Sequence, residues 1–373
     1  MNYHSTMLWY SLPLPTSIFY IRKFFKIIST CPITGQLGIL RGYPMDVLKN
    51  KVILLTGGTG SFGSKFTEMA LSQHDPAAIR IFSRGEKKQY DMMNKFRDER
   101  LRFFIGDVRD KDRLHRAMTS ADIVVHAAAL KQVPTCEYNP IEAVRTNIDG
   151  SINVIDAAID NGIERVIAIS TDKAVHPVNL YGATKMTAEK LFIQGNSYSG
   201  KVNTKFSCVR YGNVIGSRGS VIPLFLEQKK TGTITITDEK MTRFWITLDQ
   251  GVNFVIDCIG RMKGGEIFVP KIPSMKITDL AEAIAPGAKR KIIGIRPGEK
   301  IHEILLIEEE ASHAKEFSNY FIIEPEQPFW ANRNLTGGKA LRENFRYTSD
   351  ENKEWLTKQK LIKIIKEFGC LES

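Results

Sequence analysis

Short apolar runs alternate with longer amphipathic segments from Lys51 onward, and this alternation constrains the fold more than any other feature of the sequence. The apolar runs have the length of strands, and the segments between them have the apolar spacing of helices. Such an alternation forms right-handed βαβ crossovers and predicts an α/β fold with a doubly wound parallel sheet. Strands are predicted at residues 52–55, 79–82, 102–105, 123–126, 166–169 and 206–209. Helices are predicted at residues 61–73, 87–96, 111–118, 140–159 and 181–194.

The first predicted strand leads into the first predicted helix through Thr56-Gly-Gly-Thr-Gly-Ser-Phe-Gly63. Glycine permits a tight turn and lets the backbone approach a pyrophosphate, which the free N–H groups at the start of the helix can bind. Its position after the first strand favours a Rossmann-type dinucleotide site over a plain turn. The cofactor contacts expected in this segment are Thr56, Gly57, Thr59, Gly60, Ser61, Phe62 and Gly63.

The residues that follow the second predicted strand favour NADP as the cofactor. NAD-selective sites usually place an acid here, whereas this chain has Ser83 and Arg84, which suit a 2′-phosphate. The alternative is that Arg84 is a solvated loop residue and that Glu86 contacts the ribose. Further cofactor contacts are expected from Lys88, Asp107, Val108, Ala127, Ala128, Lys131 and Asn147.

Tyr181 and Lys185 stand at positions i and i+4 of a predicted helix, so both side chains lie on one face. A tyrosine with a pKa of about 10 is a poor base at neutral pH. We expect the Lys185 ammonium and a nicotinamide cation to favour the phenolate of Tyr181. Tyr181 could then accept a proton from a hydroxyl group while hydride leaves the same carbon.

Three polar residues, Thr171, Asp172 and Lys173, come directly after the fifth predicted strand. A simple oxidoreductase of this fold needs a serine or threonine here to orient its substrate, and Thr171 meets that need. Asp172 and Lys173 add an acid and a base at the carboxyl end of the strand, where the cofactor is expected. The alternative is an exposed ion pair, which contributes little to stability.

Taken together, these motifs resemble those of the UDP-N-acetylglucosamine 4,6-dehydratases that invert C5, which belong to the extended short-chain dehydrogenases. The resemblance extends from about residue 45 to residue 325. The matching segments are 56–63, 106–110, 126–134, 137–140, 170–173, 181–185, 210–219, 241–247, 265–273 and 295–300. Dehydratases that retain the C5 configuration have Asp-Glu where this chain has Asp172-Lys173, so Lys173 in particular indicates inversion.

The resemblance implies a lyase whose reaction is redox-neutral overall. Tyr181 would deprotonate the sugar 4-hydroxyl as hydride passes to NADP⁺, Lys173 would remove the C5 proton, and Asp172 would protonate the departing 6-hydroxyl. A basic Lys173 requires a lowered pKa, and an acidic Asp172 requires a raised one. The resemblance also implies a homo-oligomer, a hexamer being one option. It leaves open whether the product enters pseudaminic acid synthesis for flagellin or that of another N-acetylated deoxysugar.

A UDP-sugar substrate carries a diphosphate, so cationic residues are expected to converge on it. The substrate contacts expected from the family-like segments are Lys131, Lys173, Asn213, Arg218, Thr237, Arg243, Arg296 and Glu299. For each of these alone, a structural or surface role is an equal alternative. Residues 241–245 could equally be part of a buried strand.

Glycine and proline become frequent after residue 212, and this change in composition marks a boundary between two parts of the chain. We interpret residues 45–211 as an NADP-binding domain that holds the catalytic residues, 212–325 as a substrate-binding lobe interleaved with the sheet, and 326–373 as a tail with an amphipathic stretch at 355–368. Residues 1–44 lack acidic residues and are expected to be disordered or a non-native extension. A membrane-associating segment is the alternative, although the apolar run at 18–21 is far shorter than the roughly 20 residues that span a bilayer.

The formal net charge of +11 does not by itself indicate a nucleic-acid partner, because basic and acidic residues alternate in segments such as 109–116. The 5 cysteines have no metal-ligand spacing and no disulfide framework, which favours a cytoplasmic protein without a metal site. Three other functions are considered: a nucleotide-sugar 4-epimerase, a C5-retaining dehydratase and a non-catalytic dinucleotide sensor. The sensor is disfavoured because Tyr181 and Lys185 are both present.

Overall fold

The computed structural model describes residues 46–217, 220–326 and 337–367. The prediction for residues 1–44 and the predicted substrate contact Arg218 lie outside this part of the chain. Within it, no helix combines the length and the apolar composition that crossing a membrane requires.

The predicted strands of the first half of the chain all form, and none extends beyond the apolar run by more than two residues at either end. They are parallel, and the central residues of β1, β4, β5 and β6 are mostly buried because helices cover both faces of the sheet, whereas β3 at the edge is largely intermediate or exposed. Their bounds are β1 Val52–Thr56, β2 Ala78–Ser83, β3 Leu101–Ile105, β4 Ile123–His126, β5 Arg165–Thr171 and β6 Lys205–Tyr211. The α/β prediction is therefore confirmed.

The strand order of the main sheet is β16-β14-β15-β10-β6-β5-β4-β1-β2-β3. The order reverses between β1 and β4, which lie side by side although β2 and β3 separate them in sequence. In doubly wound sheets, ligands bind beyond the carboxyl ends of the strands at this reversal. The later strands β10 (Ile267–Pro270), β14 (Ala314–Glu316), β15 (Tyr320–Ile323) and β16 (Lys339–Ala340) extend the same sheet beyond β6.

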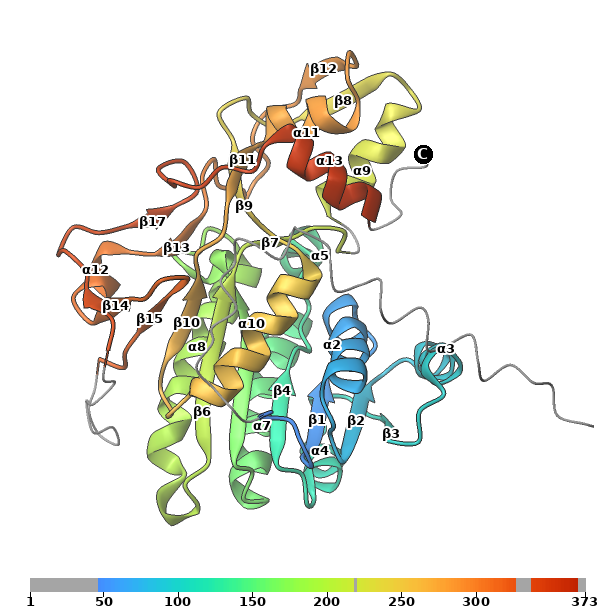
Figure 1. Ribbon diagram of the computed structural model, residues 1–373, viewed down its shortest axis with the longest axis vertical. Helices are drawn as coiled ribbons and strands as arrows, with labels where there is room; N and C mark the ends of the chain where they lie inside the picture. Colours follow the sequence, from blue (N-terminus) through green and yellow to red (C-terminus); the bar gives the residue numbers. More distant parts are fainter. Residues whose placement is uncertain (1–45, 218–219, 327–336, 368–373) are drawn as a thin grey trace, which may run out of the picture. The chain divides into compact units, whose positions relative to one another are not determined.

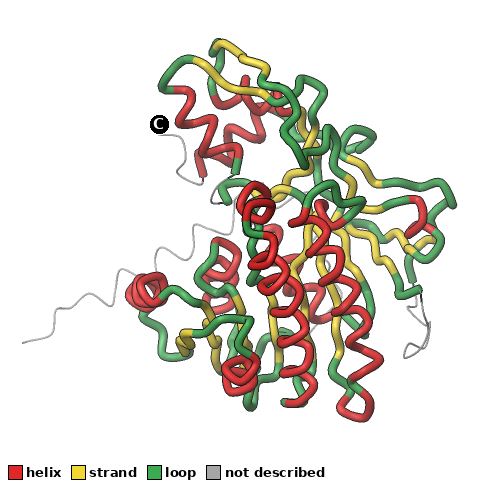
Figure 2. The backbone as a smooth tube through the Cα atoms, turned by 180° about the vertical axis from the view of Figure 1, so that it is seen from behind, coloured by secondary structure: helices red, strands yellow, loops and turns green. Residues whose placement is uncertain are grey.

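Helices cover both faces of the sheet, as the opposite views in Figures 1 and 2 show. On one face α2 (Ser61–Gln73) contacts α10 (Leu248–Arg261). On the other, α7 (Gly150–Asp160) contacts both α4 (Lys111–Met118) and α8 (Leu180–Tyr198). The helix α3 (Glu86–Phe96) packs against β2 and β3.

The helix predicted at residues 140–159 is continuous but irregular. It consists of α6 (Pro140–Val144), a π-helical turn η2 (Arg145–Asp149) and α7. The short helix α5 (Val133–Tyr138), which precedes it, was not predicted. Its Glu137 side chain accepts a hydrogen bond of 2.7 Å from the backbone N–H of Leu180, at the start of α8.

Residues after 212 also build a separate group of small elements with its own apolar core, in which Trp245, Leu280, Ile284 and Leu361 are buried. This group lies at the upper end of the view in Figure 1. Its elements are β7 Asn213–Val214, α9 Val221–Lys229, β8 Thr233–Ile236, β9 Thr242–Ile246, β11 Ser274–Lys276, α11 Ile277–Ile284, β12 Lys289–Ile292 and α13 Lys358–Glu367. A second small sheet pairs β13 (Ile304–Leu306) with β17 (Tyr347–Thr348), and α12 (Glu308–Ala311) follows β13.

Candidate functional site

The glycine turn after β1 is pressed against the end of β4. Gly57 has a φ of +67°, and a Cβ atom there would lie 2.9 Å from the backbone of Ala127 and Ala128. A Cβ atom on Gly63 would lie 2.4 Å from the carbonyl oxygen of Gly58. The helix α2 starts after Gly60 with no side chain capping it, so its first N–H groups face outward from the turn. The predicted cofactor segment thus has the close backbone approach and the open helix terminus that a pyrophosphate needs.

The residues predicted to select NADP lie at the end of β2. Ser83 is buried, and its hydroxyl oxygen accepts a hydrogen bond of 3.0 Å from Gln89. Arg84 is 59% exposed and lies 3.8 Å from the Asp107 carboxylate. Arg109 pairs with the same carboxylate at 2.7 Å, and although burial acts in the opposite direction, these contacts hold the pKa of Asp107 below its usual value. An exposed guanidinium at the end of β2 is suited to an anionic ligand.

Two of the predicted cofactor contacts, Asn147 and Val108, also make hydrogen bonds within the chain. The amide oxygen of Asn147 accepts from the backbone of Leu130, and its amide nitrogen donates to the Leu130 carbonyl and to Thr184 of α8. Asn147 therefore fixes the loop after β4 against the catalytic helix. The carbonyl of Val108 accepts a hydrogen bond from Asn153 of α7. Lys88 and Lys131 are exposed, the first on α3 and the second in the loop after β4.

The residues Thr171, Asp172 and Lys173 lie at the carboxyl end of β5, where the strand passes into a 3₁₀ turn, η3 (Asp172–Ala174). The start of α8 lies directly beside this turn. A Cβ atom on Gly182 would lie only 2.2 Å from the carbonyl oxygen of Lys173, so glycine at this position permits the contact. Tyr181 is consequently brought next to the acid and the base, as the motifs predicted.

Burial raises the pKa of the Tyr181 phenol to about 12, and the positive charge of Lys173 opposes that shift. Lys185, which the sequence indicated for this role, instead donates a hydrogen bond of 2.8 Å to the carbonyl of Ile169. Burial also lowers the pKa of Lys185. The cation that acts most strongly on Tyr181 in this structure is therefore Lys173.

Asp172 and Lys173 form a close pair, with 2.9 Å between Asp172 Oδ1 and Lys173 Nζ. Asp172 is fully buried, and burial raises its pKa. Its other oxygen, Oδ2, has no hydrogen-bond partner among the described residues. Burial alone would lower the pKa of Lys173, but the charges of Asp172 and Glu303 outweigh burial and raise it. The lowered pKa expected for Lys173 is therefore wrong for this state of the protein, because two carboxylates face its ammonium group.

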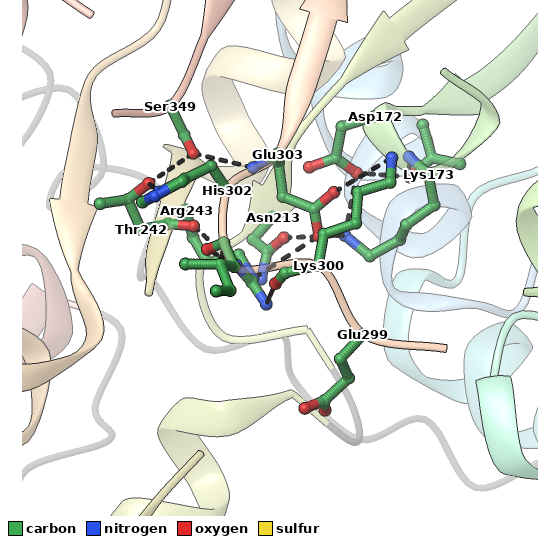
Figure 3. A network of polar contacts seen from close by, with 12 residues as sticks. Asp172, Lys173, Asn213, Thr242, Arg243, Glu299, Lys300, His302, Glu303 and Ser349 are labelled. Carbon is green, nitrogen blue, oxygen red and sulfur yellow. Dashed lines mark hydrogen bonds and ion pairs between the residues drawn. The ribbon is translucent and has the colours of Figure 1, made fainter. Parts of the chain in front are cut away.

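Glu303 is a member of this cluster that the sequence analysis missed. Its Oε1 atom lies 3.2 Å from Lys173 Nζ and 3.6 Å from Arg243 Nε, and its Oε2 atom lies 3.8 Å from Lys300 Nζ (Figure 3). Its side chain is 4% exposed. The family-like segment was taken to end at Lys300, and the sequence contains no local pattern that would distinguish Glu303 from Glu299.

The remaining predicted substrate contacts fall into two groups. Asn213 belongs to the cluster, because its side-chain oxygen accepts a hydrogen bond of 3.2 Å from Lys173. Arg243 is buried in β9, and its guanidinium donates to the carbonyls of Thr242, Lys300 and Ile301. This bonding gives Arg243 a structural role in place of the open anion contact that was expected.

The second group lies outside the cluster. The Arg296 side chain is half exposed and lies 3.9 Å from Glu299, and in Figure 3 Glu299 points away from the other labelled residues. Thr237 follows β8 and is partly buried. The geometry thus brings together an acid, a base and a phenol beside a dinucleotide-type turn, which is suited to proton transfers on a substrate that is also oxidised and reduced.

Comparisons with known proteins agree with this arrangement. A family model described as polysaccharide biosynthesis protein matches residues 53–325. The chain is 50% identical over 328 residues to the UDP-N-acetylglucosamine 4,6-dehydratase (inverting) of Campylobacter jejuni, covering 86% of this chain and 98% of that protein. It is 46% identical over 283 residues to a protein of Rickettsia canadensis named UDP-glucose 4-epimerase, covering 74% of this chain and 83% of that protein. The X-ray structure of Pen from Bacillus thuringiensis matches with a TM-score of 0.79 and 40% identity, covering 87% of this chain and 99% of that one.

Proposed function

Since the chain belongs to the polysaccharide biosynthesis protein family, we propose that it is a lyase that removes water from UDP-N-acetylglucosamine. The reaction comprises C4 oxidation, C5/C6 elimination and C6 reduction with inversion at C5. Its product is UDP-2-acetamido-2,6-dideoxy-β-L-arabino-hexos-4-ulose. The observation that carries the proposal is the buried pair of Asp172 and Lys173 beside Tyr181.

The residues around the glycine turn fit a dinucleotide, and we propose NADP. The support is the backbone cradle at Gly57 and Gly63, in which a Cβ atom would clash, together with the uncapped start of α2. Ser83 and Arg84 stand where a ribose 2′-phosphate would lie in this fold. When bound here, such a dinucleotide would supply the hydride acceptor for the oxidation at C4 and the hydride donor for the reduction at C6.

Tyr181 accepts the proton of the sugar 4-hydroxyl. Because burial raises the pKa of this phenol to about 12, it needs a positive charge nearby to release its own proton at neutral pH. Lys173 supplies such a charge, and Thr171, whose hydroxyl donates to Asp172 Oδ1 at 2.9 Å, holds the neighbouring carboxylate in place. The Tyr181 step thus depends on the same cluster that performs the elimination.

The contact between Asp172 and Lys173 can provide both the neutral amine and the carboxylic acid that the elimination requires. Transfer of one proton across the 2.9 Å from Lys173 Nζ to Asp172 Oδ1 converts the ion pair into a neutral amine and a carboxylic acid. Burial favours this neutral pair, because it penalises separated charges. The amine can then accept the C5 proton, and the carboxylic acid can protonate the departing 6-hydroxyl.

A nucleotide-sugar 4-epimerase is the second candidate, because the Rickettsia canadensis relative bears that kind of name. An epimerase also needs Tyr181 but has no use for an acid–base pair at C5 and C6. We further propose that the protein is a homo-oligomer, as its family resemblance implies, and that it is cytoplasmic, as the spacing of its cysteines favours.

The test is incubation of the purified protein with UDP-N-acetylglucosamine in deuterated water, followed by NMR, with NADP or NAD added in parallel. We expect a 4-keto-6-deoxy product that carries deuterium at an inverted C5, and no such product from Lys173→Ala. A C4 epimer would establish the second candidate, and retained C5 configuration or lack of turnover would contradict the proposal.

A further inference from the structure

Glu303 reaches the acid–base pair from a part of the chain far from it in sequence. The pair lies at the end of β5, whereas Glu303 comes just before β13. Figure 3 shows the Glu303 carboxylate among three cationic side chains, those of Lys173, Lys300 and Arg243. Because this carboxylate is buried among three cations, its interactions are with these charged groups and not with solvent.

The backbone of Glu303 is fixed by residues of two other strands. Its N–H donates to the Ser349 hydroxyl at 2.9 Å, and its carbonyl accepts from the Ser349 N–H at 2.8 Å. The Ser349 hydroxyl in turn lies 2.6 Å from the Thr242 hydroxyl, which lies 2.8 Å from His302 Nδ1. These bonds fix the backbone position from which the Glu303 side chain reaches Lys173.

Two cations beside Glu303, Arg243 and Lys300, are also fixed by hydrogen bonds. Arg243 donates to the carbonyls of Lys300 and Ile301, so it holds the segment that carries Glu303. Lys300 donates to the carbonyl of Val175, the residue after the η3 turn, at 2.5 Å. The segment at 300–303 is thereby tied to the turn that carries Asp172 and Lys173.

We propose that Glu303 is a positioning residue for the proposed reaction: it fixes the Lys173 ammonium against Asp172 and keeps one proton on that pair. This inference rests on the proposed dehydration, in which the pair must hold one proton to supply both the base and the acid. The charge of Glu303 acts on both members, since it disfavours loss of the Lys173 proton and disfavours a charged Asp172.

The test uses the full-length Glu303→Gln variant, which keeps the shape of the side chain and removes its charge. The alkaline limb of the kcat–pH profile should move to lower pH by about 1–3 units, because a nearby opposite charge shifts a pKa by that amount. KM should change little, because the buried Glu303 acts on the reaction through Lys173. The control is Glu316→Gln, which removes the charge of a β14 glutamate that pairs with Lys271 at 2.7 Å and should leave the profile unchanged.

A second measurement does not depend on turnover. The rate at which acetic anhydride labels the Lys173 amine, read by mass spectrometry at pH 9, reports its unprotonated fraction. That rate should rise about tenfold for each unit by which the Lys173 pKa falls, and should therefore be at least about tenfold higher in Glu303→Gln. Should this variant fail to fold, Glu303→Asp, whose carboxylate retracts from Lys173, should give an increase of intermediate size.

The two proposals fail in different ways. Wild-type protein that does not convert UDP-N-acetylglucosamine contradicts the proposed function, whatever the labelling shows. Wild-type protein that is active, combined with an unshifted alkaline limb and an unchanged labelling rate in a folded Glu303 variant, overturns the role of Glu303.

Discussion

A single buried imidazole couples the stability of this protein to pH. His126 ends β4, is 1% exposed, and shares a hydrogen bond of 2.8 Å with the Thr56 hydroxyl. Burial, reinforced by the charge of Lys185, lowers its pKa from 6.5 to about 3. His126 is therefore neutral in the folded protein, and its surroundings are those of a packed side chain.

The depressed pKa predicts acid lability with a definite sign. Below pH 6.5 the unfolded chain binds a proton at His126 while the folded protein does not, so stability falls as pH falls toward about 3. At pH 5 the loss from this residue amounts to about 2 kcal/mol. In His126→Asn, the free energy of unfolding measured by urea titration should fall less between pH 7 and pH 5. The exposed His115→Asn serves as the control, and an identical slope in the two variants would rule out the effect.

At the scale of elements, the junction between β1 and α2 depends on the absence of side chains. Gly63 lies inside the first turn of α2, against the Gly58 backbone, and a Cβ atom would have to displace that backbone. Gly251 lies inside α10, where a Cβ atom would meet only Ile246 Cδ1 at 3.9 Å. The two glycines are thus matched in secondary structure and differ in the space around them.

Alanine at these two positions should have opposite effects. Gly63→Ala should destabilise the protein by about 1–3 kcal/mol, the usual range for overpacking, and should weaken dinucleotide binding. Gly251→Ala should stabilise it by about 0.5–1 kcal/mol, because alanine is the better helix former. Thermal unfolding and dinucleotide titration measure both, and equal melting temperatures for the two variants would contradict the packing argument.

At the scale of the molecule, one buried ion cluster joins the two halves of the sequence. Arg210 of β6 pairs with Glu189 of α8 at 2.7 Å and with Glu310 of α12 at 3.0 Å. The charges of both glutamates outweigh burial and raise the pKa of Arg210 above its ordinary value. The packing of α12 on the sheet therefore depends on the positive charge of Arg210, which belongs to the sheet.

Removing the central charge should destabilise the whole protein. Arg210→Met leaves the buried Glu189 carboxylate and the partly buried Glu310 carboxylate without their partner, and breaking a buried pair typically costs about 3–5 kcal/mol. Lys87→Met breaks an exposed pair with Asp91 and should cost less than about 1 kcal/mol. Chemical denaturation checks both values. A loss for Arg210→Met no larger than that for Lys87→Met would show that the cluster does not couple the two halves.

The features that could be predicted from the sequence are those that depend on a pattern of neighbouring residues. Apolar runs located β1 to β6, and the glycine turn and the Tyr181–Lys185 spacing located the ends of the strands where the site lies. Glu303 could not be predicted, because it reaches Lys173 only through the pairing of β13 with β17 and the bonds to Ser349. The contact of Lys185 with the Ile169 carbonyl likewise depends on how α8 packs against β5.

The bond between Glu303 and Ser349 also has a consequence for biosynthesis. The ribosome releases the segments of β1 to β6, with Tyr181 and the acid–base pair, well before it releases Ser349. Since domains generally fold in N-terminal order during synthesis, a nascent chain can form its dinucleotide turn while Glu303 still lacks its anchor. We therefore expect catalytic competence to arise late in translation. A chain that terminates before Ser349 would contain Tyr181 but would lack the bonds that hold Glu303 beside Lys173.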